Sequence, residues 1–119
     1  MNEQIFKKRT KQLALRVIEL VSDLPSGKAS DVIGRQLLKS GTSVGANYRA
    51  ACRGKSAADV VSKLGTVEEE ADETVYWLEL LSEAGLVPES TVIPLAAEAN
   101  EILAMTVASI KTLRSRIRS

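Results

Sequence analysis

The sequence feature that most constrains the fold is a run of small residues at helical spacing between residues 36 and 53. Within it, Leu37, Gly41, Val44 and Tyr48 follow at intervals of 4, 3 and 4 residues, which places them on one face of a helix. A glycine inside a helix costs roughly 1 kcal/mol relative to alanine. Because small residues let another backbone approach closely, the pattern predicts a central helix in tight contact with its own bundle and, in an assembly, with another subunit.

Two polar side chains are expected inside this packing. Asn47 lies beside the pair Gly41 and Gly45, and a buried side-chain amide needs hydrogen-bond partners. Glu73 lies at the border of the apolar stripe of a later segment. We therefore expect Asn47 and Glu73 to be largely buried, with a hydrogen bond between them as one arrangement. In the other arrangement, Glu73 pairs with one of the basic residues Arg35, Lys39 and Arg49.

The composition is that of one globular domain, residues 1–119. Apolar residues make up 45% of the chain and charged residues 26%, and only four residues are aromatic, so the core must be mainly aliphatic. No uncharged run approaches the roughly 18 residues of a membrane span, and the first residues lack the apolar region of a signal peptide. A single cysteine fits a reducing compartment. We expect a cytoplasmic protein.

Residue types needed for common catalytic chemistry are missing. The chain has no histidine, which removes the commonest general base and the commonest zinc ligand. Cys52 therefore cannot form a thiol–imidazole pair, and it is expected to be a small buried residue. The acidic run 68–73 is read as a solvated face, because three consecutive glutamates must point in different directions. The sequence predicts a protein that is not an enzyme and that holds neither a metal nor a cofactor.

Apolar periodicity and helix-ending residues predict four helices and no strands. Pro25, Gly54 and Gly85 mark the ends of the first three helices, and Ser30 and Ser56 are expected N-caps. The connecting loops are short, so successive helices should pack antiparallel. The predicted fold class is all-α, an up-down-up-down antiparallel four-helix bundle with helices at about 3–24, 30–53, 56–84 and 90–118.

Charge is segregated along the chain although its net charge is +1. Residues 25–56 carry a net charge of +5, and residues 57–88 carry a net charge of −7. Adjacent helices could simply neutralise each other, or a basic surface could meet phosphate, or complementary faces could join subunits. In this topology, the start of the first helix and the ends of the second and fourth lie at one end of the bundle. The residues expected to gather there as a nucleic-acid-binding patch are Lys7, Lys8, Lys11, Arg49, Arg53, Arg114, Arg116 and Arg118.

Several short runs carry a resemblance to a known family. They are Gln36-Leu37, Ser43-Val44-Gly45-Ala46-Asn47, Arg53-Gly54-Lys55-Ser56 and, further on, Glu73. With them, the chain resembles the four-helix-bundle family encoded in intervening sequences of bacterial large-subunit ribosomal RNA genes. Many members have Ala-Glu-Gly where this chain has Arg49-Ala50-Ala51, so a role for that glutamate does not carry over.

The resemblance implies a homopentamer of bundles. It also implies kinship with accessory proteins of diversity-generating retroelements, which assist a reverse transcriptase and bind nucleic acid. We therefore expect a non-enzymatic oligomeric bundle that binds structured RNA or DNA, or a nucleic-acid enzyme, through its basic end. The alternative is a protein-binding or structural scaffold whose charge asymmetry serves assembly. The residues expected to support structure or subunit contacts are Gln36, Gly41, Ser43, Gly45, Asn47 and Glu73.

Overall fold

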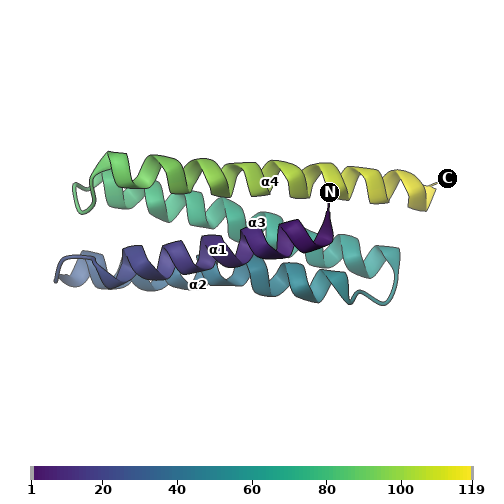
Figure 1. The fold of residues 1–119 in the computed structure, drawn as a ribbon, viewed down its shortest axis with the longest axis horizontal. Coiled ribbons are helices and arrows are strands. Elements are labelled where there is room, and N and C mark those ends of the chain that lie inside the picture. Colours follow the sequence, from purple (N-terminus) through teal and green to yellow (C-terminus); the bar gives the residue numbers. More distant parts are fainter. Residues whose placement is uncertain (1, 119) are drawn as a thin grey trace.

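The computed structural model describes residues 2–118, and within them the chain forms four α-helices and no strand (Figure 1). This confirms the all-α four-helix-bundle prediction. The helices pack side by side into an elongated body of 52 × 21 × 20 Å, and successive helices run in opposite directions. Their bounds are α1 Glu3–Ser22, α2 Lys28–Cys52, α3 Ala57–Glu83 and α4 Glu89–Arg118.

The observed helix ends differ from the predicted ones by one or two residues. The second helix begins at Lys28, before the predicted cap at Ser30. Gly27 has a φ of +145°, a conformation that favours glycine, and its carbonyl accepts the first backbone hydrogen bond of α2, from the N–H of Asp31 at 3.0 Å. Ser30 instead lies buried within the first turn of α2. The glycine therefore sets the start of the helix, and the serine does not cap it.

Two predicted capping signals are confirmed at the ends of α3. The hydroxyl of Ser56 accepts the backbone N–H of Asp59 at 3.1 Å, and the Asp59 carboxylate accepts the backbone N–H of Lys55 at 2.9 Å. At the other end, Gly85 has a φ of +73°, and the backbone N–H of Leu86 donates back into the last turn of α3. Both ends therefore satisfy backbone groups that a helix terminus leaves unpaired.

The four helices form a square in which α1 contacts α2 and α4, and α3 lies diagonally opposite α1. The α1–α4 side of the square is the most thinly packed. The core is aliphatic as predicted, with Leu13, Leu37 and Leu78 among its fully buried side chains. Phe6 and Tyr48 pack edge to face inside it, with ring centroids 4.5 Å apart.

The small-residue stripe of α2 receives α1 of the same chain. A Cβ atom on Gly41 would lie 2.8 Å from a methyl carbon of Val17, and one on Gly45 would lie 3.3 Å from the Thr10 hydroxyl. The first distance is too short for any side chain, so glycine is what lets α1 sit this close to α2. The predicted close approach of two backbones is present. The neighbour that makes it is α1, so Gly41 is buried within the chain and is not open to another subunit.

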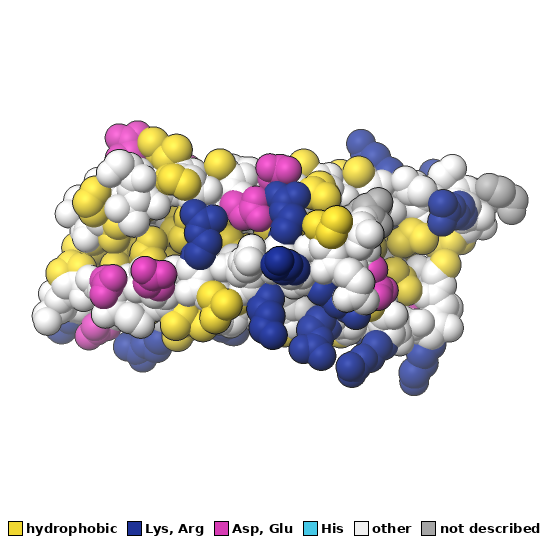
Figure 2. All heavy atoms as spheres, viewed as in Figure 1, with side chains coloured by type: hydrophobic (Ala, Val, Ile, Leu, Met, Phe, Trp, Pro, Cys, Tyr) yellow, Lys and Arg dark blue, Asp and Glu magenta, His cyan; other side chains and the backbone are white. Residues whose placement is uncertain are grey.

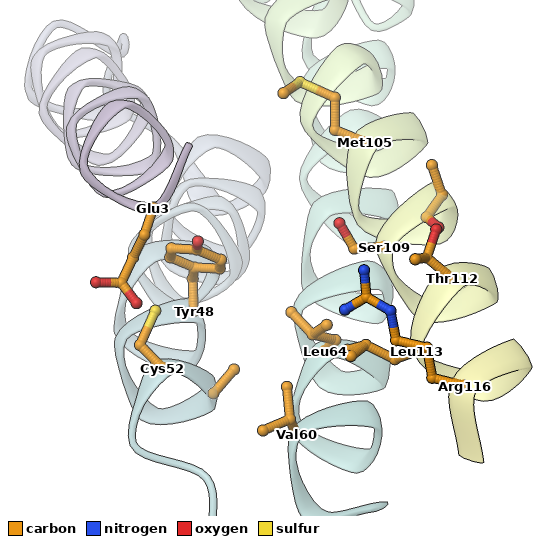
Figure 3. A pocket seen from close by; sticks show the side chains of 12 residues that line it. Glu3, Tyr48, Cys52, Val60, Leu64, Met105, Ser109, Thr112, Leu113 and Arg116 are labelled. Carbon is orange, nitrogen blue, oxygen red and sulfur yellow. The ribbon is translucent and has the colours of Figure 1, made fainter. Parts of the chain in front are cut away.

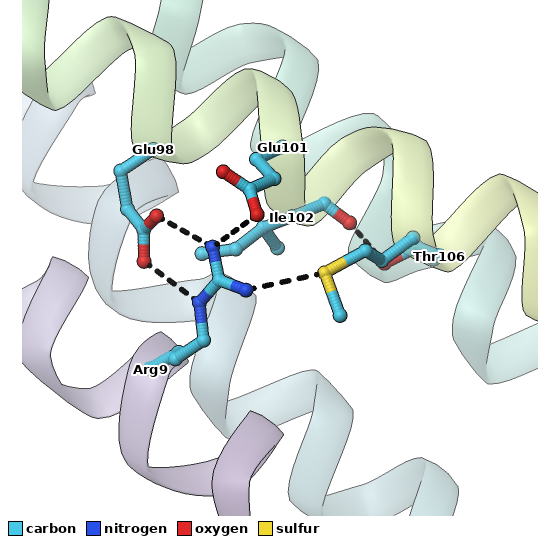
Figure 4. A network of polar contacts seen from close by, with 6 residues as sticks. Arg9, Glu98, Glu101, Ile102 and Thr106 are labelled. Atoms are coloured by element: carbon cyan, nitrogen blue, oxygen red, sulfur yellow. Dashed lines mark hydrogen bonds and ion pairs between the residues drawn. The ribbon is translucent and has the colours of Figure 1, made fainter. Parts of the chain in front are cut away.

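Arg9 provides the polar link between α1 and α4 (Figure 4). Its guanidinium forms two hydrogen bonds to the Glu98 carboxylate, at 2.7 and 3.1 Å, and an ion pair with Glu101 at 3.1 Å. A third nitrogen of the guanidinium contacts the sulfur of Met105 at 3.3 Å. These carboxylates raise the pKa of Arg9, the hydrogen bond to Glu98 being the largest cause. The charge of Arg9 is therefore already balanced within the bundle.

Among residues 2–118, α4 is the one helix long and apolar enough to cross a membrane when judged by length and composition alone. Part of its apolar surface faces the core through residues such as Leu95 and Ile102. Another part points outward. This outward stripe, which we call the α4 stripe, consists of four exposed residues spaced 4, 7 and 4 apart: Ile93, Ala97, Ala104 and Ala108.

The glycine packing generates a stability prediction. Gly41→Ala should lower the free energy of unfolding by on the order of 1 kcal/mol, because overpacking against Val17 costs about 1–3 kcal/mol while the gain in helix propensity returns only about 1 kcal/mol. Gly65→Ala is the matched control, since a Cβ there meets no atom within 4 Å. It should raise the unfolding free energy by roughly 0.5–1 kcal/mol. Urea denaturation of both variants tests this, and a stabilised Gly41→Ala protein would contradict the close α1–α2 approach.

Candidate nucleic-acid interface

A shallow groove between α1 and α2 brings together four of the predicted nucleic-acid-binding residues. We call it the basic groove, and its volume is about 520 Å³. Figure 2 shows dark blue Lys and Arg side chains gathered over the half of α1 that contains its N-terminus and the adjoining C-terminal half of α2. The groove is lined by Gln4, Lys7, Lys8, Thr10, Lys11, Ala14, Thr42, Gly45, Ala46 and Arg49.

The positive charges of the basic groove come from both of its walls. Lys7, Lys8 and Lys11 belong to α1, and Arg49 faces them from α2. Lys7 pairs with Glu3 at 3.5 Å, a long and half-exposed contact. Within the described part of the chain, no carboxylate lies within ion-pairing distance of Lys8, Lys11 or Arg49. The groove therefore carries largely uncompensated positive charge, which suits an anionic ligand.

The other four predicted binding residues do not line this groove. Arg53, Arg114, Arg116 and Arg118 are all exposed. The start of α1 and the ends of α2 and α4 lie at the same end of the bundle, as the topology required (Figure 1). The rotation of α4 about its axis, however, was not specified by that argument. The predicted patch is therefore divided into the basic groove and a separate group of arginines near the end of α4.

A second cavity lies at the open end of the bundle, where α4 extends past the start of α1 (Figure 3). It measures about 690 Å³, and its lining includes Tyr48 and Cys52 on one side and Leu113 and Arg116 on the other.

Burial raises the pKa of the Cys52 thiol, a hydrogen bond from Tyr48 acts in the opposite direction, and Glu3 raises the pKa further. These effects together raise the pKa, although Lys7 acts to lower it, so the thiolate of Cys52 is disfavoured; a reactive cysteine has a lowered pKa. It is half-buried, less buried than predicted.

Most of the acidic residues of α3 lie on its outer surface. Glu69, Asp72, Glu73, Glu79 and Glu83 are exposed, and α3 is diagonal to α1 in the bundle. This arrangement keeps the acidic helix away from the α1 wall of the basic groove. Within residues 2–118, no group of three or more Cys, Asp and Glu side chains is arranged to hold a metal ion.

Asn47 has a hydrogen-bond partner, as predicted, but the prediction that both Asn47 and Glu73 are largely buried is wrong. Glu73 is exposed and Asn47 is only half-buried. The Asn47 amide donates to the backbone carbonyl of Ser43, one turn earlier in its own helix, at 2.8 Å. The glutamate that faces α2 is Glu70, where burial is the largest cause of a raised pKa and repulsion from Glu73 adds to it. Helical spacing correctly predicted that a glutamate of this acidic run faces the bundle, but that glutamate is Glu70 and not Glu73.

The architecture and the chemistry of these surfaces define an antiparallel four-helix-bundle protein with a basic groove. The chain belongs to the 23S rRNA-intervening sequence protein family, whose family model matches residues 2–108. This confirms the resemblance found in the sequence.

A solved structure supports the same assignment. A protein of unknown function from the S23 ribosomal protein family of Bacteroides thetaiotaomicron VPI-5482 is similar to this chain, with a TM-score of 0.84 and 34% sequence identity. The match covers 89% of this chain and 98% of that chain. Among curated proteins, no match was found. The description of the family names no catalysed reaction.

Glu70 generates a prediction about pH and stability. Because its pKa is raised in the folded state, its ionisation opposes folding, so stability is greatest below its unfolded pKa of about 4.3 and falls as pH rises through the folded value. Glu70→Gln should therefore raise the melting temperature at neutral pH, and the difference should disappear near pH 3–4. Glu69→Gln, at an exposed neighbouring position, is the control. A Glu70→Gln protein that melts lower than wild type at pH 7 would contradict this.

Proposed function

We propose that this protein is a non-enzymatic, oligomeric helical bundle of the cytoplasm that binds RNA or DNA through the basic groove. The observation that carries the proposal is the set of cations on two facing helices, three on α1 and one on α2, over a floor of small residues. Phosphate oxygens are the commonest partners of Lys and Arg in nucleic-acid complexes. An open groove with such walls admits a phosphate backbone, and the cations of both walls can then contact it.

The distribution of acidic charge supports the same proposal. Phosphate approaching α1 and α2 meets a surface where the most acidic helix, α3, is held diagonally away from α1. Arg9 is held inside the chain by Glu98 and Glu101, and Lys7 makes a longer, more exposed contact with Glu3. Lys8 and Lys11 are left for an external anion. A net charge near zero therefore does not weaken the attraction at the groove itself.

Assembly into a homo-oligomer, with a pentamer as the expected state, would multiply this binding. The α4 stripe offers a subunit contact that leaves the basic groove open, because α4 and α2 are diagonal in the bundle. Each subunit would then present one groove, and several grooves engaging one nucleic acid add avidity that a single bundle lacks. The small-residue stripe of α2 no longer supports this assembly, since α1 occupies it.

The second candidate function is a protein-binding scaffold. The observation that favours it is the pairing of an exposed acidic α3 with the exposed apolar α4 stripe. Such a surface suits a basic protein partner, including a nucleic-acid enzyme of the reverse-transcriptase kind, or the basic face of a second subunit. In this case the charge asymmetry would serve assembly, and the basic groove would bind no nucleic acid.

A salt series with two matched variants tests the nucleic-acid proposal. The groove variant replaces Lys8, Lys11 and Arg49 with Gln, and the control variant replaces Arg114, Arg116 and Arg118 with Gln, so both have three fewer positive charges. The slope of log K against log salt concentration should become less steep by about 2.7 in the groove variant, which is about 0.9 for each phosphate that is no longer neutralised. In the control variant the slope should change by less. Equal flattening in both would contradict the groove as the binding site.

Light scattering tests the assembly. A pentamer of this 12.8 kDa chain has a mass of about 64 kDa, five times that of one chain. Ala104→Glu places a charge in the middle of the exposed α4 stripe and should lower the measured mass, because burying an unpaired charge in a subunit contact is costly. Circular dichroism should show unchanged helix content. A wild-type mass of about one chain at micromolar concentration would rule out the oligomer.

A further inference from the structure

We infer that the basic groove takes the phosphate backbone of a base-paired helix, and that it discriminates against an unpaired strand. This inference rests on the proposed function and names the form of nucleic acid that the groove recognises. It follows from three features of the groove: what its walls contain, what its polar groups are already bonded to, and how long it is.

The basic groove contains no aromatic side chain. Phe6 and Tyr48 pack against each other in the core. Tyr76 and Trp77 pack against each other on α3, the helix diagonal to α1. Proteins that bind unpaired strands rely on stacking bases against aromatic rings, which contributes about 1–3 kcal/mol per base. An unpaired strand in this groove would have to be ordered without that contribution.

The hydroxyl groups of the basic groove are already bonded within their own helices. The Thr10 hydroxyl donates to the carbonyl of Lys7 at 3.1 Å, and the Thr42 hydroxyl donates to the carbonyl of Leu38 at 2.7 Å. Lys and Arg contact phosphate oxygens most often and can also reach guanine edges, and apart from Gln4 and these threonines the groove offers only Gly, Ala and cations. Its chemistry therefore matches phosphate, the part of a nucleic acid that a paired helix presents on its outside.

The length of the groove matches a short piece of duplex backbone. Along α1 its lining runs from Gln4 to Ala14, which spans about 15 Å at a rise of 1.5 Å per residue. One strand of a duplex rises roughly 3.4 Å along the helix axis per phosphate, but it also winds around that axis, so its successive phosphates lie further apart than this and fewer than four fit the length of the groove. Four cations line the groove. Because both the helices and a duplex backbone are rigid, they meet without the ordering cost that a flexible strand incurs.

Fluorescence anisotropy with two labelled probes tests the inference on the full chain. The probes are an RNA hairpin and an oligouridylate with the same number of phosphates. We expect the hairpin to bind at least about tenfold more tightly, the equivalent of about 1.4 kcal/mol, with a salt slope no steeper than about −3.6, the value for one phosphate at each of the four cations. Equal or tighter binding of the oligouridylate would overturn the inference while leaving the proposed function in place. If neither probe binds at low salt, and a DNA hairpin of the same number of phosphates does not bind either, both the inference and the proposed function are overturned.

Substitutions at Ala46, an exposed residue of the groove lining, sharpen the test. Ala46→Glu should weaken hairpin binding at least about tenfold, because a carboxylate among the cations repels phosphate. Ala46→Trp should raise oligouridylate binding relative to the hairpin, because it supplies the missing stacking ring. The same two changes at Ala29, which is exposed near the start of α2 and outside the groove, are the controls. If Ala46→Glu leaves hairpin binding unchanged, the groove is not the site and the inference fails.

Discussion

The contact on which the rest of the structure depends is the close approach of α1 to α2 across Gly41. Val17 of α1 occupies the space that any side chain at position 41 would need. The same approach continues at Gly45, next to Thr10, and there it forms the floor of the basic groove. If the two helices were further apart, Arg49 would no longer face the lysines of α1 across a narrow space. The packing that stabilises the bundle is therefore also what concentrates its positive charge.

Local features of the chain were sufficient to predict the helices. Apolar spacing sets which segments are helical, and residues such as Ser56 and Gly85 mark their ends, because capping and positive φ angles depend on a few neighbouring residues. The stripe containing Gly41 likewise predicted that another backbone lies close. It did not reveal that this neighbour is α1, because a small-residue face fits any helix of suitable shape. The small-residue pattern allowed for a second subunit there as well as the chain's own bundle, and the chain's own first helix takes that place.

Features that depend on the rotation of one helix against another were not predictable. Arg9 stands in a cluster of basic residues in the sequence, yet its partner Glu98 is 89 residues away. Glu70 and Glu73 differ by three positions on α3, and a rotation of part of a turn decides which of them faces α2. The separation of Arg114 from the basic groove has the same origin. Topology placed the basic residues of the predicted patch at one end of the bundle. Which side of that end each of them occupies depends on packing that the sequence pattern does not specify.

The square arrangement of helices also separates the surfaces on which the two proposed interactions rest. The basic groove uses α1 and α2, the α4 stripe lies on the helix diagonal to α2, and the acidic face lies on the helix diagonal to α1. Arg9 joins α1 to α4 and uses its charge in doing so. Subunits that meet through α4 would therefore keep their grooves open, with the acidic helix diagonal to the α1 wall of each groove. A chain with a net charge of only +1 can carry an excess of positive charge at the groove because 8 of its 15 acidic residues lie on α3, the helix diagonal to α1.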